Sequence, residues 1–431
     1  MLPAWLLFAV SIAYVGLLFA IAHAGDRAAA RQPAPAARPW VYSLALAVYC
    51  TSWTFYGAVG RAATSGWDFL PINLGPVLMF VAGYPLVLRI VEISKRNNIT
   101  SIADFIGARY GRHQSVAMLV TLIAVTGVLP YIALQIKAVA FSFETLAGPG
   151  TAPARDSALV IAGLLAVFAI LFGTRQVVSS ETHHGMMLAI AFESVIKLVT
   201  FLAVGLYAVY GVYHGFADAY AHALVLPQVL HAPESGDWQA GFFTQTVLAM
   251  GAVLCLPRQF QVAVVENTAA ADVRAARWIF PLYLGLLSVL VLPLAAAGLQ
   301  RLPEARADTY LLALPLSQGH PLLALAAYVG GFSAATSMVI VACIALSTML
   351  CNEVVMPVLL RMRGAGYARG RDLSGLLKRI RRIAIVAIVA LAYLYYRWFG
   401  GPGTLSSIGL LSFSAVAQFL PALIGGLYWR R

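Results

Sequence analysis

Three ionisable residues lie within long apolar stretches of the sequence: Lys137, Glu193 and Lys197. A charge inside a lipid bilayer is costly, so each of these residues is a candidate for ion or proton coupling. Glu193 and Lys197 are four residues apart and share one face of a helix, so mutual neutralisation is the alternative interpretation. Lys137 has no neighbouring acidic residue, and its long side chain could instead snorkel toward the membrane surface.

Three further titratable residues come just before the helix expected to carry Glu193: Glu181, His183 and His184. A glutamate suits the start of a helix, where its charge meets the positive end of the helix dipole. The two histidines could relay protons, because imidazole changes charge near neutral pH. Glu181 is therefore a coupling candidate as well, with stabilisation of the helix end as the alternative.

Two apolar stretches are interrupted part-way along their length by polar residues or proline. One carries the polar run Cys50-Thr51-Ser52, with Gly57 and Gly60 beyond it. The other runs into Leu256-Pro257-Arg258, where proline removes an amide and disfavours helix at the residue before it. Carbonyls and amides freed at such breaks can hold an ion or a solute at mid-membrane depth.

The composition favours a membrane protein. Hydrophobic residues make up 61% of the 431 residues and charged residues 11%, too few to cover a soluble body of this size. The net charge of +12 is not gathered into one face with interleaved aromatics, so nucleic acid is not an expected partner. The four cysteines are unpaired in spacing and have no histidine partner nearby, so neither disulfides nor zinc is expected. No catalytic residue is assigned.

Apolar stretches long enough to cross a bilayer recur along the whole chain. They predict about eleven transmembrane helices, the first at about 3–23 and not a removable signal peptide. Lysine and arginine gather in alternate connections, which places the amino terminus outside and the carboxyl terminus in the cytoplasm. The expected protein is a multi-pass component of the bacterial inner (plasma) membrane. The other helices are expected at about 40–60, 70–91, 115–141, 157–174, 184–212, 241–257, 277–299, 321–351, 382–398 and 404–429.

Four segments follow from this pattern. Residues 1–39 form an accessory first helix with a flexible cytoplasmic link at Gly25–Pro39, which is rich in Ala, Pro and Arg. Residues 40–213 and 241–431 each hold five helices of opposite orientation, separated by an extracytoplasmic loop at 214–240. Such halves are the arrangement of an inverted-repeat transporter, although any ten-helix chain with an odd repeat shows the same inversion.

Several motifs on these helices resemble those of the sodium/solute symporter family. They are Ser52-Trp53 with Gly57, Gly60 and Ser65-Gly66, then Ser101–Gly111, Ser333–Met338, Ser407–Pro421 and Gly425–Trp429. The resemblance spans nearly the whole chain and implies an all-α, leucine-transporter-like five-plus-five inverted repeat with one extra N-terminal helix. It also implies Na⁺ or H⁺ as the coupling ion, with no organic cofactor.

The resemblance implies two groups of site residues. The sodium ligands would be the carbonyls of Ala47 and Cys50 with Ala334, Ser337 and Met338 on the eighth core helix. Met338 stands where the family places a second hydroxyl, so the sodium site is altered. If the alignment to the family motif is shifted by one residue, Thr336 and Ser337 occupy the two hydroxyl positions instead. The solute site, from the resemblance and the helix breaks together, comprises Thr51, Ser52, Trp53, Tyr131, Gln135, Pro257 and Arg258.

Three segments are closest to the N-terminal symporter-like domain of bacterial sensor histidine kinases: Val128–Gln135, Pro257–Phe260 with Glu266-Asn267, and Ala335–Val341. The resemblance implies that the chain senses or transports a small polar solute such as an amino acid, as the input domain of a kinase. Its partners would then be the solute, the lipid bilayer, a cytoplasmic kinase module and a response regulator. The alternatives are a stand-alone sodium- or proton-coupled symporter and a receptor that binds solute without moving it.

Overall fold

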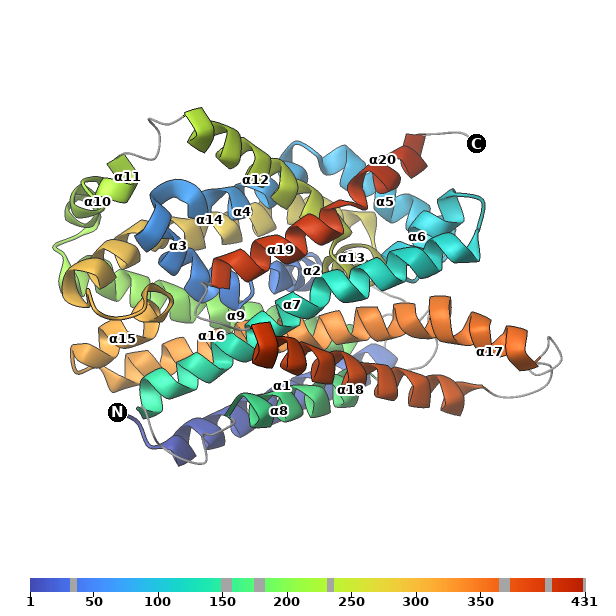
Figure 1. Cartoon of the computed structure of the whole chain (residues 1–431), viewed down its shortest axis with the longest axis horizontal. Coiled ribbons are helices and arrows are strands. Elements are labelled where there is room, and N and C mark those ends of the chain that lie inside the picture. Colours follow the sequence, from blue (N-terminus) through green and yellow to red (C-terminus); the bar gives the residue numbers. More distant parts are fainter. Residues whose placement is uncertain are drawn as a thin grey trace.

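The computed structural model describes residues 1–31, 37–148, 157–173, 183–230, 236–363, 373–399 and 405–428. Across these ranges the regular structure is entirely helical, as expected (Figure 1). The helices up to the middle of the chain are α1 (Ala4–Ala30), α2 (Pro39–Ala45), η1 (Leu46–Tyr49), η2 (Trp53–Gly57), α3 (Ala58–Ser65), η3 (Gly66–Phe69), α4 (Leu70–Val81), α5 (Tyr84–Arg96), α6 (Ile102–Arg109), α7 (Gln114–Ala147), α8 (Ser157–Gly173), α9 (His184–Tyr207) and η5 (Ala208–Val212).

The second half begins with two short helices, α10 (Phe216–Leu224) and α11 (Pro227–Leu230), inside the segment expected to be a loop. They are followed by α12 (Gly236–Cys255), α13 (Pro257–Phe260), η7 (Gln261–Val265), α14 (Ala270–Arg301), η8 (Ala307–Thr309), α15 (Tyr310–Ser317), α16 (Pro321–Met349), η9 (Leu350–Val355), α17 (Met356–Arg363), α18 (Ser374–Phe399), α19 (Leu405–Ala417) and α20 (Leu420–Tyr428).

Six of the described helices are long and apolar enough to cross a membrane, or up to eight spans if each of two bent pairs counts as one. Large apolar side chains on their outer faces are exposed, among them Trp5, Leu119, Val199 and Leu282. Lipid is the solvent that such a surface requires. Figure 1 shows α1 beginning at the end of the bundle opposite to α20. The total of eleven spans and the orientation in the membrane stay predictions.

Both predicted helix breaks are present. Between η1 and η2 the backbone at Cys50 is extended, with a ψ of 96°, and Thr51 is not helical. Between α12 and α13, Leu256 is extended with a ψ of 123°, and the chain bends by 54°. Leu256 precedes Pro257, which disfavours the helical conformation at the residue before it. The polar run and the proline therefore mark the interruptions correctly.

Two expectations about helices were wrong. The helix expected at 70–91 bends by 70° between α4 and α5. Gly83 lies at this bend and Pro85 opens α5, so the helix lacks a backbone donor there. The first helix, expected to end at about residue 23, continues to Ala30, because the alanines of this segment favour helix. Residues 32–36 of the expected link lie outside the described residues.

The first helix packs closely into the bundle. Ser11 and Tyr14 form hydrogen bonds with Tyr328 and Ser333 of α16, at 2.9 and 2.8 Å. Near its other end, α1 crosses α9 at a glycine, since a methyl group added to Gly185 would lie 2.0 Å from the Ala22 carbonyl oxygen. The expected accessory helix is therefore held against the two helices that carry the central polar groups.

Candidate functional site

The break in the first core helix is held open by side chains from α7. The Thr51 hydroxyl lies 2.8 Å from the Tyr131 hydroxyl. The Gln135 side-chain oxygen accepts a hydrogen bond from the Ser52 backbone amide at 3.1 Å. Tyr131 and Gln135 are four residues apart, which places both on one face of α7. All four residues are buried, so the amide freed by the break has a protein partner in place of water.

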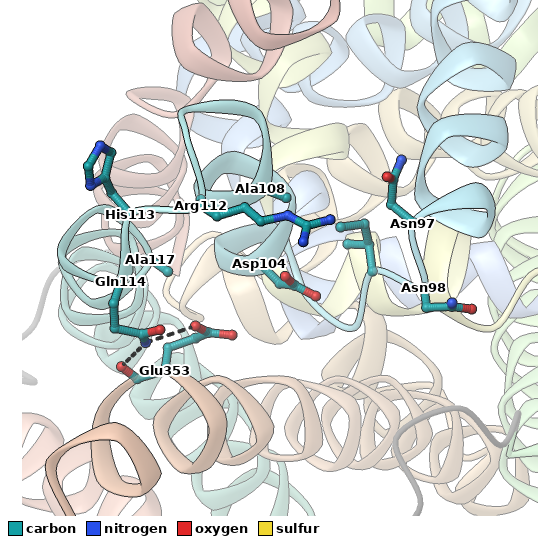
Figure 2. A pocket seen from close by; sticks show the side chains of 11 residues that line it. Asn97, Asn98, Asp104, Ala108, Arg112, His113, Gln114, Ala117 and Glu353 are labelled. Carbon is teal, nitrogen blue, oxygen red and sulfur yellow. Dashed lines mark hydrogen bonds between the residues drawn. The ribbon is translucent and has the colours of Figure 1, made fainter. Parts of the chain in front are cut away.

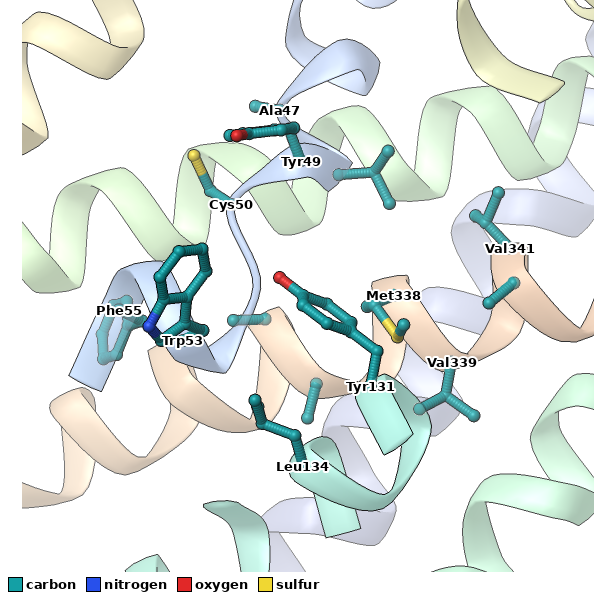
Figure 3. Packing of buried hydrophobic residues seen from close by; sticks show 14 of the residues in the cluster. Ala47, Tyr49, Cys50, Trp53, Phe55, Tyr131, Leu134, Met338, Val339 and Val341 are labelled. Atoms are coloured by element: carbon teal, nitrogen blue, oxygen red, sulfur yellow. The ribbon is translucent and has the colours of Figure 1, made fainter. Parts of the chain in front are cut away.

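Aromatic rings surround this break. Figure 3 shows Tyr131 pointing from α7 toward the extended backbone at Cys50, with Trp53 and Tyr131 on either side of that backbone in this view. Phe413 of α19 packs against both rings, with centroids 5.4 Å from Trp53 and 5.8 Å from Tyr131. The sequence did not single out Phe413. The only signal was its place inside the Ser407–Pro421 motif.

The second break contributes a buried cation. Arg258 is 1% exposed, and its guanidinium lies over the Tyr131 ring at 4.5 Å from the centroid. Its three side-chain nitrogens form no hydrogen bond of good geometry with the residues that the structure describes, and the Tyr131 hydroxyl is the one side-chain group there that makes a weaker polar contact with the guanidinium. The next residue, Gln259, donates to the Leu46 carbonyl at 3.0 Å and so ties the two breaks together.

Most of the residues expected at the solute site therefore meet in one place. Thr51, Ser52, Tyr131 and Gln135 are joined by hydrogen bonds, and Arg258 stacks on one of them. The Trp53 ring lies beside them with its indole nitrogen unpartnered within the described part of the chain. The remaining member, Pro257, opens α13 directly before Arg258 and sets the direction of that helix.

The residues expected to hold sodium hold an ammonium group. The Lys197 Nζ donates to the carbonyls of Ala47 at 3.0 Å and Cys50 at 3.2 Å, and to the Ser337 hydroxyl at 3.4 Å. Ser337 is thus the α16 hydroxyl that faces the open carbonyls. Since a cationic side chain already engages these oxygens, they do not fit a sodium ion in this arrangement.

The other two positions expected on α16 make no such contact. Met338 is fully buried among apolar residues, and Figure 3 shows it beside Tyr131. Ala334 offers its carbonyl to Ser337 of its own helix, at 3.4 Å. Thr336, the residue that a one-residue shift would bring in, donates instead to a Glu193 carboxylate oxygen at 2.7 Å.

Glu193 and Lys197 form no ion pair within 4 Å in the described structure, although both lie on one face of α9. The carboxylate is bound by Thr336, and the Glu193 backbone carbonyl accepts from Ser333 at 3.0 Å. The direct pair that helix spacing allowed is therefore replaced by separate partners on α16 and on the broken helix. Their charges neutralise each other only at a distance.

One remaining coupling candidate, Lys137, lies on another face of α7. Lys137 is buried, two residues beyond Gln135 and so about 200° around the helix from it. It does not share the face that holds the break open. The other candidate, Glu181, lies outside the described residues.

His183 forms a buried ion pair that the sequence did not indicate. Its Nδ1 lies 2.7 Å from one Glu266 carboxylate oxygen, and its backbone amide donates to the other at 2.7 Å. Burial alone would lower the pKa of His183, but the Glu266 charge outweighs it and the pKa is raised above 6.5. Burial alone would raise the pKa of Glu266, but His183 outweighs it and the pKa is below 4.5. The pair fastens the start of α9 to the end of η7.

This pair predicts a pH dependence of stability. Because the pKa of His183 is raised in the folded state, its contribution to the free energy of unfolding is complete below about pH 6.5 and is lost as pH rises through the folded-state pKa. The lowered pKa of Glu266 means that its contribution is present above about pH 4.5 and is lost as pH falls through its folded-state pKa. We expect His183→Gln to cost about 2 kcal/mol near pH 6 and little at pH 9. Thermal unfolding in detergent at both pH values measures this, and an equal loss at both would contradict it.

A separate cavity of about 370 Å³ lies between α6, the start of α7 and η9, at the end expected to be cytoplasmic. Figure 2 shows Asp104 and Arg112 at its wall, and Gln114 hydrogen-bonded to Glu353 at one edge of it. None of the expected solute or sodium residues lines this cavity.

The Ser101–Gly111 motif has a structural role in the same region. The Ser101 hydroxyl accepts from the Asp104 amide at 3.0 Å, and the Asp104 carboxylate accepts from the Thr100 amide at 2.9 Å. These two bonds cap the start of α6. Tyr110 then donates to the Ala422 carbonyl of α20 at 3.1 Å. The motif thus joins a capped helix to α20.

Comparison with known proteins decides the family. The model of the "Sodium:solute symporter family" matches residues 38–307, well over half of the chain and both helix breaks. The chain belongs to the sodium:solute symporter family. This membership and the apolar helices establish a multi-pass membrane protein, consistent with a bacterial inner membrane. The family is one of transporters, which favours transport over catalysis.

Individual relatives of this symporter family member agree with that assignment. It is 26% identical over 288 residues to an uncharacterized symporter, YhjB, of Bacillus subtilis (strain 168). That match covers 65% of this chain and 56% of the relative, so the chain spans little more than half of the relative's length.

Solved structures show the same architecture. A substrate-bound, outward-open Na⁺-coupled sialic acid symporter superposes with a TM-score of 0.72 at 12% identity, covering 98% of this chain and 86% of the other. A mutant manganese transporter from Eremococcus coleocola gives a TM-score of 0.50 at 13% identity, covering 92% of this chain and 97% of the other. The first similarity confirms the leucine-transporter-like fold for this symporter family member.

Proposed function

We propose that this chain binds and translocates a small polar solute that carries an anionic group, with amino acids as the leading class. The observation that carries the proposal is the Arg258 guanidinium, which is buried at the helix break with no ion pair and no hydrogen bond of good geometry in the described structure. A buried guanidinium without such a partner is costly, and a carboxylate is the group that its planar fork fits.

The surroundings of Arg258 support an anionic solute. Lys197 lies close enough for the two positive charges to repel each other. Glu193, on the same helix as Lys197, forms no ion pair within 4 Å in the described structure, and its side chain accepts a hydrogen bond from Thr336. One positive charge is therefore left without a local counter-charge, and a solute carboxylate would balance it.

Polar groups at the first break complete this solute site. The hydroxyls of Thr51 and Tyr131 lie within one hydrogen bond of each other, and the Trp53 indole nitrogen has no partner among the described residues. These groups could bind the amino or side-chain end of an amino acid. The names of the relatives agree with transport of a small solute, since one is a symporter and another a sialic acid symporter.

A ligand-stabilisation screen tests the proposal. Purified protein in detergent would be heated with each of the common amino acids and small carboxylates, and with their amidated or decarboxylated analogues. We expect at least one carboxylate to raise the unfolding temperature, because a ligand that binds only the folded state stabilises it. Its uncharged analogue should have no such effect. Stabilisation by neutral analogues equal to that by carboxylates would contradict the role of Arg258.

For the whole protein, the same proposal includes a sensory role, with this chain as the input domain of a membrane sensor histidine kinase acting on a response regulator. The support is the resemblance of Val128–Gln135, Pro257–Phe260 and Ala335–Val341 to such domains. These segments supply Tyr131, Gln135 and Arg258 at the solute site and Ser337 beside Lys197. A stand-alone symporter is the alternative. The reading frame beyond codon 431 distinguishes them, since further helices or a stop without a kinase module would contradict the sensory role.

A further inference from the structure

The Lys197 ammonium is fully matched by oxygen atoms. A lysine side chain has three donors and no acceptor. Three oxygens receive them, the carbonyls of Ala47 and Cys50 and the hydroxyl of Ser337. Lys197 is 1% exposed, and the three partner residues are no more than 2% exposed. The ammonium group and its three partners thus all lie in the protein interior.

The Cys50 carbonyl is freed by the helix break, because Cys50 is extended and η2 begins only at Trp53. The Ala47 carbonyl accepts from the Cys50 amide at 3.0 Å, and its second lone pair remains for Lys197. Open carbonyls with a hydroxyl from a facing helix are the hard oxygen ligands that an alkali cation prefers. Lys197 reaches this cation site from α9, which packs against both α2 and α16.

We propose that the Lys197 ammonium is the permanent cation of this site, and that solute binding by this chain does not require sodium. The ammonium supplies the same unit charge to the same oxygens as a sodium ion would. Because it is covalently attached to α9, it cannot diffuse away from the protein. The chain therefore keeps the cation-stabilised helix break of its family but replaces a diffusible ion with a side chain.

Two features of α16 agree with this replacement. Met338 places a thioether, a poor ligand for sodium, where the family resemblance implies a second hydroxyl. Thr336, the other hydroxyl that the family resemblance offers for this site, donates instead to the Glu193 carboxyl group at 2.7 Å. Arg258 adds a further positive charge close to Lys197, which disfavours entry of another cation.

The Lys197→Ala variant tests the proposal. Thermal unfolding of purified protein is measured in NaCl, KCl and choline chloride at equal ionic strength, with no solute present. We expect the wild type to unfold at the same temperature in all three salts. The Lys197→Ala substitution frees these oxygens. The unfolding temperature of this variant should be raised by NaCl and not by the other two salts, since a bound ion stabilises the folded state. Lys137→Ala, which removes a buried lysine elsewhere, is the matched control and should show no sodium response.

Each outcome has a definite meaning. The proposal is overturned if the wild type unfolds at a higher temperature in NaCl than in choline chloride. It is also overturned if Lys197→Ala folds but its unfolding temperature does not rise in NaCl. If Lys197→Ala does not fold, equal wild-type unfolding temperatures in the three salts still support the proposal. Because no solute is used, these results stand apart from the assignment of Arg258, which is tested by carboxylates alone.

Discussion

Replacing Arg258 with glutamine should weaken binding of the stabilising carboxylate by about 100-fold while leaving the unliganded protein folded. Removing one partner of a buried charge pair costs about 3 kcal/mol or more of binding free energy, and each 1.4 kcal/mol is a factor of about ten. The unliganded protein loses the contacts of Arg258 with the ring and the hydroxyl of Tyr131, but no ion pair and no hydrogen bond of good geometry within the described structure. Ligand titrations followed by thermal unfolding measure both quantities.

Two further variants make this test specific. Arg258→Lys keeps the positive charge but loses the planar fork, so we expect an intermediate loss of affinity. Arg274→Gln removes an exposed arginine of α14 and serves as the matched control, with unchanged binding. If Arg258→Gln unfolds the protein in the absence of ligand, or binds the carboxylate as well as the wild type, Arg258 has a structural role and the solute assignment fails.

A single methyl group at Gly331 should destabilise the protein by about 3 kcal/mol. Gly331 lies on α16 against the aromatic residues of η2, and an added Cβ would be 1.9 Å from the Tyr56 hydroxyl oxygen and 2.2 Å from its ring. Tyr56 is 1% exposed, so its ring has no free space into which it could move. Forcing extra volume into such a core typically costs 1–3 kcal/mol, and the overlap here places Gly331→Ala at the upper end.

Gly285→Ala provides the control for this effect. Gly285 is also in the middle of a long helix, α14, but nothing lies within 4 Å of its added Cβ. Alanine favours helix over glycine by about 0.5–1 kcal/mol, so this variant should be as stable as the wild type or slightly more. Thermal unfolding in one detergent compares the three proteins. Equal stability of Gly331→Ala and Gly285→Ala would show that η2 does not pack on α16 as described.

The sequence predicted the helical fold and the two breaks because both depend on local chemistry. Apolar length gives a helix in a membrane, and a proline or a polar run interrupts it where Leu256 and Cys50 are extended. The bend between α4 and α5 was missed because Gly83 and Pro85 lie within an apolar stretch that reads as continuous. The gathering of Thr51, Tyr131 and Gln135 could be anticipated from family motifs, but not their hydrogen bonds.

The partners of the buried charges could not be predicted from the sequence. Helix spacing suggested a pair between Glu193 and Lys197, since residues four apart are neighbours on a helix. In the structure, Lys197 instead donates hydrogen bonds to the carbonyls of Ala47 and Cys50, about 150 residues earlier in the chain. That choice depends on how α9 packs against the broken helix. Phe413 and the His183–Glu266 pair were missed for the same reason, because only tertiary packing brings them to their partners.

The covalent attachment of the Lys197 charge to α9 limits the energy source that a carrier built in this way can use. A diffusible ion carries the free energy of its own gradient into each transport cycle, whereas a charge fixed to α9 by a hydrocarbon stem enters and leaves with the protein. A sodium gradient across the membrane would then perform no work on the solute. On that basis, occupancy of the site by solute would follow the external concentration of that solute and would not report the energy state of the cell.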